Sequence, residues 1–90
     1  MELPITIEII KKGKWYVAKA LELDFVSQGR TAEEAKKNLF EVMEIQFEEM
    51  QKMGTLKDYL EECGYMIDKK MEYCPEFVSL ERTEIILPCR

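Results

Sequence analysis

The acidic side chains around the first two predicted strands are the residues whose types and spacing come closest to a catalytic set. Glu8 lies on the first strand, and Glu22 and Asp24 follow the second. Three carboxylates that converge on one point could hold divalent metal ions for a nuclease reaction. Glu22 and Asp24 fall in a turn rather than on a strand, so a metal-dependent nuclease is the less favoured alternative.

Other catalytic chemistries lack their usual groups. The chain has no histidine, so neither general acid–base catalysis nor a cysteine nucleophile has its common base. The cysteines, Cys63, Cys74 and Cys89, form no Cys-x-x-Cys pair for zinc, and their odd number argues against a disulfide framework. We expect them to be small buried hydrophobic residues, and we expect no catalytic residue, cofactor or metal site.

The charge balance favours a protein partner over a nucleic acid. The 90 residues include 13 basic and 18 acidic ones, a net charge of −5, and the basic residues form no stripe. Phosphate neutralisation by basic residues supplies most nucleic-acid affinity, so we expect no nucleic acid to bind this chain by itself. A basic protein suits an acidic surface, although net charge also serves solubility. No secretory signal and no apolar run of about 18 residues is present, which predicts a cytoplasmic protein without a membrane span.

Hydrophobic alternation predicts three strands at the start of one domain that covers residues 1–90. The strands lie at residues 5–10, 15–21 and 25–28, and Gly13 supplies a turn with positive φ between the first two. The expected result is an antiparallel meander. Three strands form a stable sheet only if one face is covered.

The predicted cover is a long helix over residues 32–53. Thr31 and Glu34 form a capping box at its start, Gly54 ends it, and Gly29 gives backbone freedom where the third strand ends. A 100° periodicity predicts a core stripe with the polar Gln46 near its middle. The stripe consists of Ala32, Ala35, Leu39, Val42, Met43, Met50 and Met53.

The remaining third of the chain predicts a short helix and one more strand. Thr55 is expected to cap a helix that ends at Gly64, with Leu56, Tyr59, Leu60 and Cys63 on one face. Residues 65–80 are predicted to be a loop or hairpin, and residues 82–88 a final strand beside the first one. The expected class is α+β: a three-stranded antiparallel meander plus a C-terminal strand, with a long helix on one face and an extra short helix.

Four aromatic residues are the candidate partner-binding residues, since aromatics often anchor interfaces. Trp15 and Tyr16 lie on the predicted hairpin, and Phe40 and Phe47 lie one heptad apart at an edge of the helix stripe. The alternative is that Trp15 and Tyr16 cover the sheet and that the two phenylalanines pack under the C-terminal segment. Strand pairing, or helix packing through Phe40 and Phe47, would also give a homodimer or higher homo-oligomer.

The order of motifs resembles the HicB-like antitoxin family. The matching positions are Gly13 with Tyr16–Val17–Ala18, then Ser27–Gln28–Gly29 with Thr31, and then Glu33–Glu34–Ala35 at the opening of the long helix. The resemblance covers residues 5–49. Many members carry a Pro-Gly turn where this chain has Leu23–Asp24–Phe25, which bears on the local turn shape more than on the fold.

The resemblance implies a partial ribonuclease-H-like core of β-β-β-α-β order and an antitoxin role. Such a protein binds and blocks a small basic HicA-type toxin that cleaves messenger RNA. Longer members add a DNA-binding module, which we do not expect here because little chain follows Glu84. The alternative is a solitary oligomeric domain of unknown function without a toxin partner.

Overall fold

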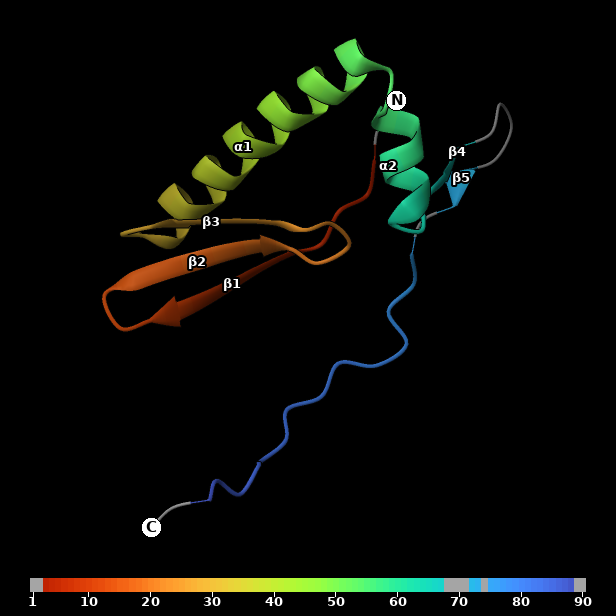
Figure 1. The fold of residues 1–90 in the computed structure, drawn as a ribbon. Helices are drawn as coiled ribbons and strands as arrows, with labels where there is room; N and C mark the ends of the chain where they lie inside the picture. The colour runs from red at the N-terminus through yellow and green to blue at the C-terminus, as the bar shows by residue number, and fades with distance from the viewer. Residues whose placement is uncertain (1–2, 68–71, 74, 89–90) are drawn as a thin grey trace.

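The computed structural model of the chain describes residues 3–67, 72–73 and 75–88. It has an α+β fold in which a three-stranded antiparallel sheet is followed by a long helix and a short helix, as predicted (Figure 1). The elements are β1 (Ile7–Lys12), β2 (Trp15–Ala20), β3 (Phe25–Gly29), α1 (Ala32–Met53), α2 (Leu56–Glu62), β4 (Met66–Ile67) and β5 (Glu72–Tyr73).

The sheet has the order β1-β2-β3 and is a simple meander. Its register pairs Ile9 with Ala18 and Ala18 with Ser27. Gly13 turns the chain between β1 and β2 with a φ of 60°, which confirms the turn predicted there. A bond from the Leu21 amide to the Thr6 carbonyl, 2.9 Å long, continues the β1–β2 ladder beyond its last pair.

The two faces of the sheet have different surroundings, because successive residues of a strand point to opposite sides. Ala18 and Ala20 of β2 are fully buried under α1, so they and the residues paired with them form the inner face. The residues between them form the face away from α1, which we call the open face. Its members are Glu8, Ile10, Lys12, Trp15, Val17, Lys19, Val26 and Gln28.

Helix α1 begins and ends where its caps predict. Thr31 has an extended backbone, and its hydroxyl oxygen accepts a 3.0 Å hydrogen bond from the Glu34 amide. Gly54 is left-handed with a φ of 74°, and its amide bonds to carbonyls of the last turn. The core stripe is confirmed in its first half, where Ala35, Leu39 and Met43 are buried.

The second half of that stripe is confirmed only in part. Met50 is half-buried, but Gln46 is exposed rather than facing the core, and Met53 is 71 % exposed. The half-buried Phe47 instead packs against the core in this part of α1. The helix axis therefore leaves the sheet toward its C-terminal end.

Gly29 serves close packing rather than backbone freedom, which corrects the reason predicted for it. Its φ is not among the positive values of the chain, which belong to Gly13, Gly54 and Gly64. A Cβ at this position would lie 2.6 Å from the Ala35 amide nitrogen and 2.9 Å from the Glu34 Cβ. Only glycine allows the end of β3 to approach the first turn of α1 this closely.

The region after α1 closes the fold onto the N-terminal segment. The predicted face of α2 is confirmed, since Leu60 is buried and Leu56, Tyr59 and Cys63 are half-buried. The prediction that Thr55 caps α2 is wrong, because its side chain makes no capping hydrogen bond. Its hydroxyl instead donates a 3.4 Å hydrogen bond to the Met50 carbonyl.

Tyr65 joins the two ends of the folded part. It is 1 % exposed, and its hydroxyl donates a 2.7 Å hydrogen bond to the Pro4 carbonyl. Strands β4 and β5 then pair in the hairpin foreseen for this stretch. Cys63 is a free thiol, whereas Cys74 and Cys89 lie outside the described residues.

The predicted C-terminal strand is absent. Residues 75–88 have no regular secondary structure and run away from the sheet, as Figure 1 shows in blue. Val78 and Ile86 are 97 % and 96 % exposed. The Cα radius of gyration is 16.1 Å, against about 12 Å for a compact chain of this length. The segment has strand-like residues but no partner strand within its own chain, so it forms no ladder.

Candidate interaction surfaces

The acidic residues considered for metal binding do not form one site. The Glu22 carboxylate accepts hydrogen bonds from the Thr6 amide at 2.7 Å and from the Thr6 hydroxyl at 2.8 Å. It therefore fastens the segment before β1 to the turn after β2. Glu8 lies on the open face of the sheet. Among the residues described, no group of three or more His, Cys, Asp or Glu is placed to hold a metal ion.

Trp15 and Tyr16 point to opposite faces of the sheet, because they are neighbours on β2. Trp15 is on the open face, is 42 % exposed, and has the Arg30 guanidinium 5.6 Å from its ring centroid. Lys14, Trp15 and Arg30 line a hollow of about 200 Å³. Tyr16 is half-buried on the inner face, with the Lys11 ammonium 5.9 Å from its ring. The two residues therefore cannot serve one contact surface.

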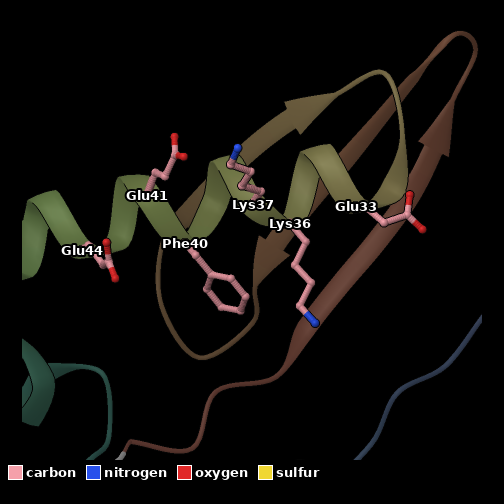
Figure 2. Close-up of a pocket in the computed structure, with 6 residues that line it drawn as sticks. All are labelled: Glu33, Lys36, Lys37, Phe40, Glu41 and Glu44. Atoms are coloured by element: carbon pink, nitrogen blue, oxygen red, sulfur yellow. The ribbon is translucent and has the colours of Figure 1, made fainter.

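Phe40 projects from the exposed flank of α1 and is 43 % exposed. It lies in a hollow of about 410 Å³ that is lined by Glu33, Lys36, Lys37, Phe40, Glu41 and Glu44. Figure 2 shows the Phe40 ring and the Lys36 side chain on the same side of the helix, while Lys37 and Glu41 point to the other side. The Lys36 ammonium lies 5.6 Å from the ring centroid, close enough for a cation–π interaction.

Phe47 belongs to the packing beneath α1, although it shares a heptad position with Phe40. Its ring meets Phe25 of β3 edge-on, with centroids 5.8 Å apart and planes at 88°. Phe25 also contacts Tyr59 of α2 at 6.0 Å. This aromatic trio ties the helix to the sheet and to α2, so of the two phenylalanines only Phe40 is presented to a partner.

Tyr59 is held in a protonated state by this packing. Burial raises the pKa of its hydroxyl above the ordinary value, and the nearby Cys63 thiol adds to the rise. A hydrogen bond with the backbone of Asp24 opposes the shift without cancelling it. The shift thus has a structural cause, the packing of Tyr59 against the core.

The flank of α1 around Phe40 is acidic. The helix carries six glutamates and three lysines, a net charge of −3 out of the chain's −5. Three of those glutamates, Glu33, Glu41 and Glu44, line the hollow together with Lys36 and Lys37, so the lining keeps a net charge of −1. An exposed aromatic ring beside a surplus of carboxylates suits a basic protein segment, which can offer both apolar stems and cationic heads.

Sequence reasoning missed two features outside the four aromatic residues. The open face exposes Ile10 and Val26, because no second layer covers it. The two edges of the sheet also differ: the Asn38 side chain of α1 donates a 2.9 Å hydrogen bond to the Gln28 carbonyl of β3, and α1 packs mainly over β3 and β2. The β1 edge lacks such cover. Period-two alternation could have identified the open face, but not the off-centre position of α1.

Comparisons with known proteins returned nothing: no family model matches the chain, and searches of curated proteins and of solved structures found no match. The resemblance to HicB-like antitoxins thus stays a prediction. No helix in the described part of the chain has the length and apolar character that crossing a membrane requires.

Proposed function

We propose that this chain is a non-catalytic protein-binding module of the cytoplasm, which acts as an antitoxin by holding a small basic, RNA-cleaving toxin on the flank of α1. The observation that carries the proposal is Phe40, an exposed ring in a hollow that three glutamates and two lysines line. The resemblance of the chain to HicB-like antitoxins supplies the class of partner.

The chemistry of this flank explains how a basic protein would be recognised. Its carboxylates attract the partner over a distance of about 8–10 Å in physiological salt, which raises the association rate. The Phe40 ring then supplies a desolvated contact at the centre, where most binding energy is concentrated. Lys36 covers part of that ring in the free chain, so an arginine of the partner would take over its position.

Substitution on α1 tests the proposal directly. Phe40→Ala should weaken binding to a small basic HicA-type toxin by roughly tenfold or more, as loss of a central aromatic does. The measurement is isothermal titration of the two purified proteins at several salt concentrations. Glu44→Lys reverses a charge at the hollow. The loss of affinity that it causes should therefore be larger at low salt than at high salt, where charges are screened.

Ile45→Ala is the matched control. Ile45 is another large apolar residue of α1 with 59 % exposure, but it does not line the hollow around Phe40. Its truncation should leave the affinity unchanged. Equal effects of the two substitutions, or no binding by the unaltered chain, would rule out this flank as the toxin-binding surface.

A further inference from the structure

We infer that residues 83–87 form a strand only in a dimer, by pairing with the β1 edge of a second copy of this chain. This inference does not rest on the proposed function, because it uses the β1 edge and the C-terminal segment rather than the flank of α1. Its starting point is that residues 83–87, which favour a strand, and the uncovered β1 edge occur in one chain and do not pair with each other.

Residues 83–87 have the composition of a strand, but they do not pair with another strand in the described part of the chain. Residues 83–87 read Thr-Glu-Ile-Ile-Leu, and β-branched residues favour strands. Ile85, Ile86 and Leu87 are between 70 % and 96 % exposed. Monomeric proteins rarely leave a contiguous apolar run so bare, so another surface has to cover it.

The β1 edge is the receptor that the sheet offers. Asn38 and the position of α1 shield the other edge at β3. Ile9 on the inner face and Ile10 on the open face are 38 % and 43 % exposed, so β1 offers one exposed isoleucine on each side. A strand carrying Ile85 and Ile86 likewise presents one isoleucine to each face, and an open edge pairs readily with such a segment.

The length of the connection favours a second copy over the same chain. Pro75 lies against Gly64, next to Tyr65, whose hydroxyl reaches Pro4 just before β1. From Pro75 to Thr83 an extended chain covers about 26 Å, the same span as from Pro4 to Lys12. If the segment ran beside the β1 of its own chain, Thr83 would therefore reach the end of β1 at Lys12. Residues 83–87 would then have no β1 residues left to pair with.

Folding back onto the same edge would need a turn in the connection. Residues 76–82 read Glu-Phe-Val-Ser-Leu-Glu-Arg, in which Ser79 is the one residue that turns favour and no glycine, asparagine or aspartate occurs. This composition favours a chain that continues past its own sheet. In a two-fold dimer the segment then runs antiparallel to the β1 of the partner subunit, and each subunit donates to the other.

Charge fits this arrangement. The antiparallel register that places Ile86 opposite Ile10 of the second copy also places Glu84 opposite Lys12. Opposite charges in directly facing positions stabilise a strand pair, whereas like charges destabilise it. The parallel register with the same isoleucine pair would instead set Glu84 against Glu8.

The test is the mass of the full chain in solution, together with amide hydrogen exchange at residues 83–87, both under reducing conditions. The unaltered chain should have twice the 10.7 kDa of one copy at micromolar concentration, with slowed exchange in the segment. Successive amides of a strand point to opposite sides, so only one of two neighbouring amides faces the partner strand. Ile85→Pro combined with Ile86→Pro removes both amide donors, and with them the one that faces β1. This variant should become a monomer while its helix content stays the same, because the segment lies apart from the sheet and α1.

Ser79→Pro, in the connection, is the matched control and should remain a dimer. A dimer that persists in the double proline variant would overturn the inference. So would an unaltered chain of monomeric mass, whether its segment exchanges fast, as an unpaired tail, or slowly, as a strand on its own β1.

Discussion

Gly29 shows how a single residue connects two elements. The glycine was predicted from the junction between strand and helix, but its role depends on a contact that becomes visible only when α1 lies on the sheet. Its missing Cβ leaves room for the backbone at Glu34 and Ala35. Packing of this kind tolerates no added methyl group unless the helix shifts.

Gly29→Ala should therefore destabilise the chain by about 1–3 kcal/mol, the usual cost of overpacking. Gly13→Asn is the control, because it also replaces a glycine but meets nothing within 4 Å, and asparagine tolerates the positive φ. Urea denaturation followed by circular dichroism measures both. Equal stabilities of Gly29→Ala and the unaltered chain would show that β3 and α1 do not approach so closely.

Tyr59 makes the stability of the fold dependent on pH in the alkaline range. Burial raises its pKa in the folded state, so the unfolded chain loses the proton first as the pH rises. The stability linked to Tyr59 is fully present below the unfolded pKa of about 10 and is lost as the pH rises through the folded pKa. Tyr59→Phe should thus lose less stability than the unaltered chain above that pH.

The measurement is the denaturation midpoint of both proteins between neutral pH and the alkaline limit. Both proteins share every ionisable group except Tyr59, so only the difference between the two curves reports on Tyr59. Parallel curves across the whole range would contradict the assigned cause of the shift.

At the level of elements, the sequence predicted the features that depend on neighbouring residues, namely the bounds of α1 and the register of the hairpin. The bounds of α1 follow from Thr31 and Gly54, whose capping bonds involve neighbouring residues only. Strand register likewise follows from the hairpin turn at Gly13 and from alternation. Trp15 and Tyr16 pointed to opposite faces for the same reason, which adjacency on a strand alone would have predicted.

The length of α1 relative to the sheet determines which residues at the end of the helix are exposed, and the helical periodicity alone does not predict this. Strands of five or six residues span roughly 20 Å, whereas 22 helical residues span about 33 Å. The last third of α1 therefore extends beyond the sheet, which exposes Gln46 and Met53. Phe47 is half-buried there because Phe25, which also contacts Tyr59 of α2, packs against its ring, whereas Phe40, one heptad earlier, is 43 % exposed.

For the molecule as a whole, the composition of the C-terminal segment predicted a strand that the single chain does not form. A strand needs a partner edge, and the single chain does not bring its own edge to residues 82–88. The result is an extended molecule, 55 Å along its longest axis, whose most apolar exposed part is its tail. The flank of α1 around Phe40 and the β1 edge are distinct surfaces, so the proposed toxin contact and the proposed dimer do not compete for the same residues.

The central claim is that binding by this chain silences an RNA-cleaving protein. Its most direct test is RNA cleavage by a small basic HicA-type toxin, followed while this chain is added in increasing amounts. We predict that cleavage stops at an equimolar ratio, and that Phe40→Ala requires a large excess whereas Ile45→Ala does not. Cleavage that continues undiminished with the unaltered chain in excess would contradict the claim.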